Sequence, residues 1–249
     1  MKRRANMWKM FLPALLLGAL LLATGCSEDE TVSDRVDSRG LGGGPVTPAD
    51  VNVLLLGQDD LSGFAFVQGY LTPFGFPVVD TYDNTIATPT LADLSAYQAV
   101  MVWTDGSPAS VTALGDLLAD YVDAGGGVVV ATYGHAAGYG VGGTFAAGGY
   151  SPFNFDAVNP NTVTSMSTVY DAAHPIMAGV VSLGVRYRDN PTVAPDGIVL
   201  ADWAAGNAAI GVNATGTVVG LAMSPVDGGN LTGNYPELFS NALTFTASN

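Results

Sequence analysis

The chain has 249 residues, 22 of them acidic and 8 basic, and its formal net charge is −14. This excess of carboxylates excludes nucleic-acid binding, which depends on neutralising phosphates with Lys and Arg, and docking on anionic lipid through a basic surface. Cys26 is the single cysteine, so an internal disulfide and a cysteine-rich zinc site are excluded as well.

The first 25 residues have the composition of a secretory signal. Four basic residues and no acid lie in the first nine positions, and an almost wholly apolar run of about a dozen residues follows. Such a run is too short to span a bilayer comfortably, which favours a cleaved signal peptide over an uncleaved membrane helix. Cleavage removes Lys2, Arg3, Arg4 and Lys9, and the formal charge becomes −18.

The run that ends at Cys26, Leu22-Ala23-Thr24-Gly25-Cys26, resembles the lipobox of bacterial lipoprotein precursors, with Ala23 where leucine is more usual. The resemblance implies cleavage before Cys26, a diacylglyceryl group on its sulfur, and acylation of the new amino group by a chain such as palmitate. Each buried methylene contributes about 0.8 kcal/mol, so two or three chains anchor a protein stably. Ser27 rather than Asp follows Cys26, which favours the outer membrane by the sorting rule of enteric bacteria. We therefore expect a membrane-anchored lipoprotein of the cell envelope.

Residues 26–49 are predicted to form a lipid anchor and a flexible tether. The segment is acidic and then glycine-rich, and such a composition cannot bury enough apolar surface to fold. As a flexible coil it would span about 25–30 Å. Residues 50–249 are long enough for one domain with a sizeable core. Without the signal the chain has no lysine, which excludes Schiff-base chemistry through that side chain.

Strands and helices alternate through the first half of this domain. Short apolar runs predict buried strands at 51–56, 77–80, 98–104 and 128–131. Helical spacing predicts helices at 62–72 and 91–97, and a third with Ser107 as N-cap and Pro108 as its first residue. A long loop is expected over 133–149, then strands at 197–200, 208–212 and 218–223, and a helix over 235–246 with a capping box of Asn234 and Glu237. The pattern predicts an α/β fold with a largely parallel sheet.

Several stretches of residues 50–248 resemble the class I glutamine amidotransferase-like fold and its trehalose-utilisation-type domains. They are VNVLLLG, LGDLLADYVDAGGGVVVATYGH, AHPIMAGV, VVGLAMSP and NYPELFSNALTF. The resemblance implies a flavodoxin-like three-layer sandwich. In catalytic members a cysteine stands in the turn after the fourth strand, where this chain has Thr132-Tyr133-Gly134-His135. The downstream His and Glu pair has no clear counterpart, and these departures from the family pattern argue against amidotransferase and protease activity.

Polar residues follow the predicted parallel strands, where open α/β sheets bind ligands. Asp59 and Asp60 follow the first strand, Asp105 follows the third, and His135 follows the fourth. Together they are the candidate ligand crevice, and they could coordinate a hard cation or orient a water molecule. The alternative is that they only end strands and cap helices. Adjacent carboxylates argue against a phosphate-binding loop, so no cofactor is predicted.

Two further features have a functional and a structural interpretation. Arg186 and Arg188 would share one face of a strand. They could clamp an anion, but pairing with carboxylates such as Asp189 is the simpler expectation. His174 precedes a proline in a turn, where a structural role is favoured over a catalytic one.

Three functions remain open at this point. The first is a lipid-anchored, non-catalytic amidotransferase-like domain that binds a small-molecule ligand or an envelope protein. The second is a hydrolase or carbohydrate-related enzyme that uses the candidate ligand crevice, with a divalent cation. The third is a purely structural envelope module whose acidic surface keeps it soluble.

Overall fold

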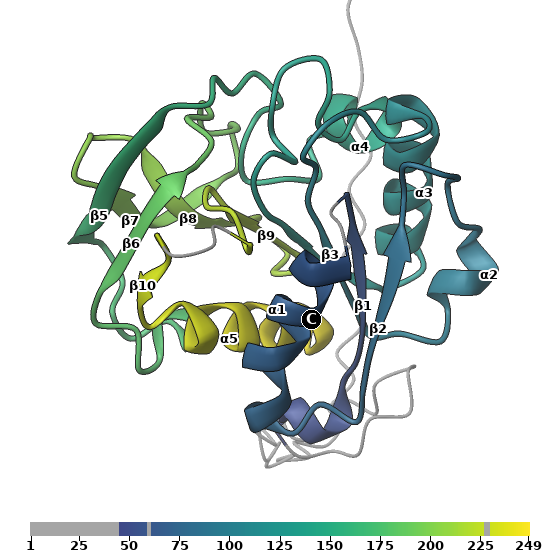
Figure 1. The fold of residues 1–249 in the computed structure, drawn as a ribbon, viewed down its shortest axis with the longest axis horizontal. Coiled ribbons are helices and arrows are strands. Elements are labelled where there is room, and N and C mark those ends of the chain that lie inside the picture. Colours follow the sequence, from purple (N-terminus) through teal and green to yellow (C-terminus); the bar gives the residue numbers. More distant parts are fainter. Residues whose placement is uncertain (1–44, 59–60, 227–229) are drawn as a thin grey trace, which may run out of the picture. The chain divides into compact units, whose positions relative to one another are not determined.

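The computed structural model describes residues 45–58, 61–226 and 230–249 (Figure 1). Cys26, the predicted signal peptide, most of the tether, and Asp59 and Asp60 lie outside the described residues. Across the described part, ten strands form one sheet in the order β10-β6-β5-β7-β8-β9-β4-β3-β1-β2. The strands are β1 (Asn52–Gly57), β2 (Val78–Asp83), β3 (Ala99–Val102), β4 (Gly127–Val130), β5 (Asn161–Val169), β6 (Leu183–Tyr187), β7 (Ile198–Trp203), β8 (Ala208–Val212), β9 (Val218–Leu221) and β10 (Thr232–Gly233).

The sheet is parallel in one half and antiparallel in the other. β2, β1, β3, β4 and β9 pair in parallel, whereas β9, β8, β7, β5, β6 and β10 pair antiparallel. The expectation of a largely parallel sheet therefore holds only for the half that contains β1. Short turns join β7 to β8 and β8 to β9, and such turns produce antiparallel neighbours because a parallel pair needs a long crossover.

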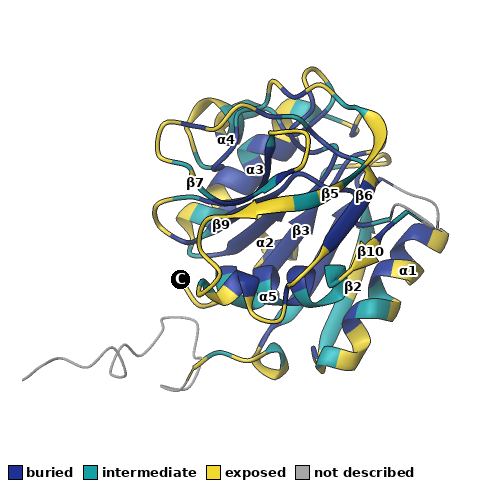
Figure 2. Ribbon diagram, turned by 90° about the vertical axis from the view of Figure 1, so that its left-hand side faces the viewer, coloured by how far each residue is buried: buried dark blue, intermediate teal, exposed yellow. Residues whose placement is uncertain are grey.

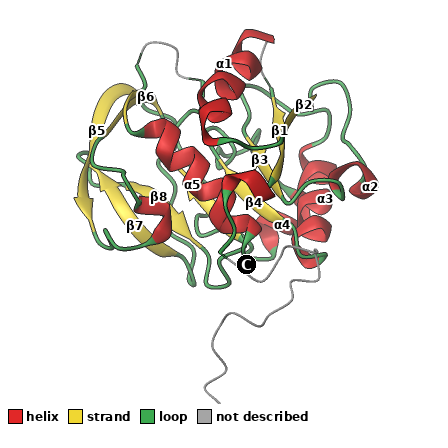
Figure 3. Cartoon of the chain, turned by 90° about the horizontal axis from the view of Figure 1, so that it is seen from below, coloured by secondary structure: helices red, strands yellow, loops and turns green. Residues whose placement is uncertain are grey.

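Five α-helices are described: α1 (Leu61–Leu71), α2 (Leu91–Leu94), α3 (Val111–Asp123), α4 (Gly143–Ala147) and α5 (Tyr235–Ala247). Side chains alternate along β1, so Val53 and Leu55 enter one buried cluster with α1 and α5. Leu54 and Leu56 enter a second cluster with α2 and α3. Figure 3 shows the side of the molecule on which α1 and α5 lie. Among the helices that the structure describes, none is long and apolar enough to cross a membrane.

The structure corrects two predicted helix caps. Ser110, not Ser107, caps α3, because the Ser110 side-chain oxygen accepts a hydrogen bond from the Ala113 amide at 3.1 Å. Asn234 makes no side-chain cap for α5. Its Oδ1 atom instead accepts hydrogen bonds from the amides of Val181 and Ser182, at 3.1 and 3.2 Å, which ties the start of α5 to the chain before β6.

Most elements that the sequence did not predict lie in the antiparallel half, namely β5, β6 and β10. In the parallel half, α4 lies inside the predicted loop 133–149 and packs against α3. β5 reads NTVTSMSTV, and most of its residues are exposed, as Figure 2 shows. A strand without a buried face lacks the apolar alternation by which strands are recognised.

Candidate functional site

A cavity of about 360 Å³ opens at the carboxyl ends of the parallel strands. Its described lining comes from the residues that follow β3, β4 and β9 and from the end of β6. These residues are Trp103, Thr104, Asp105, Thr132, Tyr133, Tyr187, Ser224 and Val226. This is the edge at which open α/β sheets bind ligands, and the sequence had placed the candidate ligand crevice there.

Backbone hydrogen bonds fix the segments around this cavity. The Tyr133 amide donates to the Thr104 carbonyl at 2.9 Å, so the chain after β4 stays beside the chain after β3. The Ser224 amide donates to the Tyr187 carbonyl at 3.0 Å, which joins the end of β9 to the end of β6. A Cβ atom at Gly57 would overlap the Trp103 indole ring, so glycine at the end of β1 leaves room for that ring.

Two atoms of lining residues are buried polar groups with unmet hydrogen-bonding capacity. Trp103 Nε1 and Thr104 Oγ1 have no hydrogen-bond partner among the described residues, and both side chains are fully buried. The side-chain amides of Gln58 and Asn84, at the ends of β1 and β2, are also buried without a hydrogen-bond partner among the described residues. Each such group costs about 1–3 kcal/mol when left unpaired, and native proteins satisfy nearly all of them. Four of them at one edge of the sheet indicate a place where a polar ligand or water binds.

The cavity is electrostatically negative. Asp105 is the one charged side chain in the described lining, which includes no Lys, Arg or His. Burial, and then the carboxylate of Asp105, raises the pKa of the Tyr133 phenol well above its usual value. The phenol therefore stays protonated and uncharged at physiological pH.

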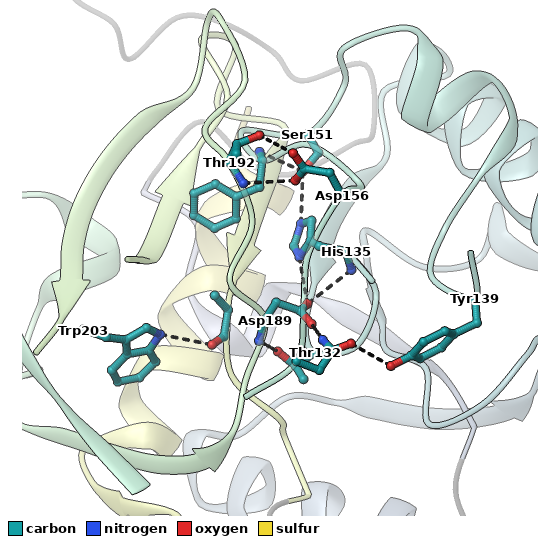
Figure 4. A network of polar contacts seen from close by, with 11 residues as sticks. Thr132, His135, Tyr139, Ser151, Asp156, Asp189, Thr192 and Trp203 are labelled. Atoms are coloured by element: carbon teal, nitrogen blue, oxygen red, sulfur yellow. Dashed lines mark hydrogen bonds and ion pairs between the residues drawn. The ribbon is translucent and has the colours of Figure 1, made fainter. Parts of the chain in front are cut away.

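His135 does not join Asp105 in this cavity. Its ring is fully buried, with Nδ1 3.3 Å from Asp189 Oδ2 and Nε2 3.2 Å from Ser151 Oγ (Figure 4). Both ring nitrogens thus have partners within the protein. No group of three or more His, Cys, Asp or Glu side chains in the described part of the chain could hold a metal ion. Of the candidate ligand crevice, the structure places Asp105 at the cavity and His135 in a separate polar network.

Asp189 is the centre of that network. Its Oδ2 atom also accepts from the His135 amide at 3.2 Å, and its Oδ1 atom accepts from Asn159 Nδ2 at 2.6 Å. The Asp189 amide donates to Thr132 Oγ1 at 3.0 Å. Thr132 also lines the cavity, so the network supports the cavity wall after β4. These residues are far apart in the sequence, and no local pattern signals their contact.

The order Asp189–His135–Ser151 resembles the relay of serine hydrolases in its connectivity. The surroundings argue for a structural role. Ser151 is 3% exposed, and its Oγ atom accepts a hydrogen bond from the Phe153 amide at 3.2 Å. The His135 ring packs against Phe153 and Phe155, with both centroid distances 5.4 Å. A nucleophile must contact its substrate, and Ser151 is not in the described lining of the cavity.

The arginines differ from expectation. Arg188 is 3% exposed and lies just beyond β6, and its guanidinium donates to the carbonyl and hydroxyl oxygens of Thr162. The expected pair between Arg188 and Asp189 is wrong, because Asp189 turns toward His135 and Asn159. Arg186, within β6, is exposed, whereas Arg188 is buried against Thr162.

His174 has the structural role that its sequence context favoured. Its Nδ1 atom accepts a hydrogen bond from the Ile176 amide at 3.3 Å, and its ring centroid lies 4.8 Å from that of Phe245. Burial lowers the pKa of His174, which keeps the ring neutral and able to accept that hydrogen bond.

No protein-family model and no curated protein matches the chain. Among solved structures, a cytoplasmic protein from Salmonella typhimurium is 15% identical, with a TM-score of 0.58, and the match covers 78% of this chain and 98% of that one. A ThuA-like protein from Bacteroides uniformis is 15% identical, with a TM-score of 0.57 over 78% and 90% of the two chains. A GMP synthase subunit from Thermoplasma acidophilum is 15% identical, with a TM-score of 0.52 over 80% and 95%. The chain therefore has a ThuA-like, glutamine amidotransferase-like fold.

Proposed function

We propose that this chain is a lipid-anchored protein of the cell envelope whose domain binds a small polar ligand without amidotransferase chemistry. The domain is proposed to be a three-layer sandwich in its parallel half, with the ligand at the carboxyl ends of the strands. The observation that carries the proposal is the cavity itself, with the unpartnered atoms Trp103 Nε1 and Thr104 Oγ1 on residues of its described lining.

Binding is favoured over catalysis by the residues at this cavity. The turn after β4 reads Thr132-Tyr133-Gly134-His135 and offers no cysteine. A general base must lie within hydrogen-bond reach of the proton that it removes. His135, the histidine of that turn, is buried with both ring nitrogens hydrogen-bonded, so Asp105 is the one candidate base of the described lining. The described lining therefore supplies recognition groups but no activated nucleophile.

A ligand screen with a matched pair of variants tests the binding proposal. The full chain is screened by thermal shift against small neutral, cationic and anionic polar compounds. At least one should raise the melting temperature, and Thr104→Val, which removes a hydroxyl at nearly constant volume, should reduce that shift. Thr81→Val is the control because Thr81 is exposed on the edge strand β2. No shift with any compound, or equal shifts in both variants, would refute the binding site.

The anchor is tested separately. Cells producing the wild-type chain should incorporate labelled palmitate into it, and Cys26→Ser should abolish the label. Fractionation of the envelope should place the wild type in the outer membrane, because Ser27 follows the lipidated position. Label that persists in Cys26→Ser would show that the resemblance to a lipobox is accidental.

A further inference from the structure

We infer that the cavity selects a small organic cation, an ammonium compound that also carries an uncharged oxygen acceptor. The inference rests on the proposed function, since it names the chemical class of the ligand at that same site. Three independent properties of the described lining support it: its charge, its aromatic rings, and its unmet hydrogen-bonding groups.

The charge of the described lining excludes anionic ligands. Asp105 is the sole ionised side chain of the described lining, and an anion there would meet its carboxylate without a compensating Lys, Arg or His. Arg186 and Arg188 both flank Tyr187 in sequence, but neither belongs to the described lining, and the Arg188 guanidinium donates to Thr162. The strongly acidic composition of the chain adds to the local attraction for cations.

Aromatic rings provide the second property. Tyr133 and Tyr187 line the cavity and, unlike the fully buried Trp103, are partly exposed, and the faces of such rings attract ammonium groups. The Asp105 carboxylate and the Tyr133 ring line the same cavity, and burial, together with that carboxylate, raises the pKa of the phenol. A ring that stays an uncharged phenol beside a carboxylate combines both attractions for a cation at one place.

The hydrogen-bonding groups define the rest of the ligand. Trp103 Nε1 can only donate, so its missing partner is an acceptor, and near Asp105 an uncharged hydroxyl or carbonyl oxygen fits better than a carboxylate. Thr104 Oγ1 can accept from an ammonium N–H or from a ligand hydroxyl. A neutral polyol would satisfy these two atoms but would gain little from the Asp105 carboxylate and the two tyrosine rings. The combined set favours an amino alcohol or a similar cation.

Binding of choline and ethanolamine to the full chain in detergent tests the inference by calorimetry. The comparison compounds are neohexanol and tert-butylacetate. Neohexanol (3,3-dimethylbutan-1-ol) is the uncharged carbon isostere of choline. The tert-butylacetate used is the anion 3,3-dimethylbutanoate, which has a similar shape. At least one of the two cations should bind tenfold or more tightly than neohexanol, and tert-butylacetate should bind more weakly still. Raising the salt concentration should weaken binding of the cation and leave neohexanol unaffected.

Two pairs of variants separate the contribution of the Asp105 charge to binding from that of the Tyr133 ring. Asp105→Asn should reduce cation affinity about tenfold and leave neohexanol binding unchanged. Asp120 is an exposed carboxylate on α3, outside the described cavity lining. Asp120→Asn therefore removes the same charge and should change neither the cation affinity nor the neohexanol affinity. Tyr133→Phe keeps the ring and should retain affinity, whereas Tyr133→Leu should lose several-fold.

The outcomes distinguish the two proposals. If neohexanol, tert-butylacetate or any compound of the wider screen binds at this cavity and neither cation binds more tightly, the ligand class is wrong and the binding site stands. If no compound of any charge binds, the proposed function fails together with the inference. Equal losses in Asp105→Asn and Asp120→Asn would show that net charge, and not this cavity, attracts the cation.

Discussion

Asp105 and Asp189 both lie just beyond the end of a strand, but they differ in burial and in their contacts. Asp105 is exposed at the cavity, where its charge is available to a ligand, while Asp189 is fully buried and accepts hydrogen bonds from three donors. The sequence predicted that Asp105 would lie at this edge, because it follows a recognisable apolar strand. It could not predict Asp189, whose partners His135 and Asn159 come from distant segments. Hydrogen bonds between such segments leave no periodic trace.

Replacing Asp189 should destabilise the domain far more than replacing Asp105. Asp189→Ala leaves the donors of His135 and Asn159 buried without an acceptor, which should cost about 3 kcal/mol in the free energy of unfolding. Asp105→Ala should change that free energy by less than about 0.5 kcal/mol, as is usual for exposed positions. Denaturant unfolding of both variants measures the difference. Equal midpoints would mean that the buried network does not stabilise the fold.

Tyr97 should make stability depend on pH in the alkaline range. Burial, and then its hydrogen bond to Asp80 Oδ2 at 2.8 Å, raises the pKa of Tyr97 to about 12. The folded state prefers the protonated phenol, so this contribution is complete below the unfolded pKa of about 10 and is lost as pH rises toward 12. Unfolding midpoints of the wild type should therefore fall more steeply above pH 10 than those of Tyr97→Phe. Parallel curves would contradict this.

At the scale of elements, apolar continuity decided what could be predicted. β1, β3, β4 and β8 were located because their residues are nearly all buried, and such strands read as unbroken apolar runs. β5 has no such apolar run, since its threonines and serines are mostly exposed, and it was therefore not predicted. The position of the cavity followed from the parallel strands alone. Its content followed only in part: Asp105 was placed there, whereas Trp103 reads in sequence as a core residue next to β3.

The start of α3 offers a direct test of the corrected cap. Ser110→Ala removes the acceptor of the Ala113 amide and should lower the free energy of unfolding by about 1 kcal/mol. Ser107→Ala should change it by less than about 0.5 kcal/mol, because Ser107 is exposed and lies before the helix. Chemical denaturation of the two variants supplies the comparison. A larger loss for Ser107→Ala would restore the cap expected from the sequence.

For the whole molecule, charge is the dominant property. The chain has 22 acidic and 8 basic residues, so carboxylates far outnumber the groups that could pair with them. Carboxylates that repel one another across the surface weaken the compact state, and dissolved salt screens that repulsion. The acidic composition thus excludes polyanionic partners and makes stability sensitive to ionic strength.

Salt should stabilise this protein. Raising the ionic strength from about 0.01 to about 0.15 M shortens the screening length from about 30 to about 8 Å. The melting temperature should therefore rise by several degrees, and most of the rise should occur at low salt. Calorimetric scans at constant pH test this, with a neutral osmolyte as the control for changes in solvent quality. A melting temperature that falls with salt would mean that attractive ion pairs outweigh the repulsion.

The place of β9 in the sheet has a consequence for the order in which the chain can be completed. β9 pairs with β4 on one side and β8 on the other, so residues 218–221 join the two halves of the sheet. Until those residues are available, β4 and β8 each have an open edge of apolar residues, which invites pairing with other molecules. A growing or truncated chain that stops before residue 218 should therefore be a substrate for holding chaperones and not a smaller stable domain. A strand near the end of the chain, and not one near its start, therefore completes the sheet between its two halves.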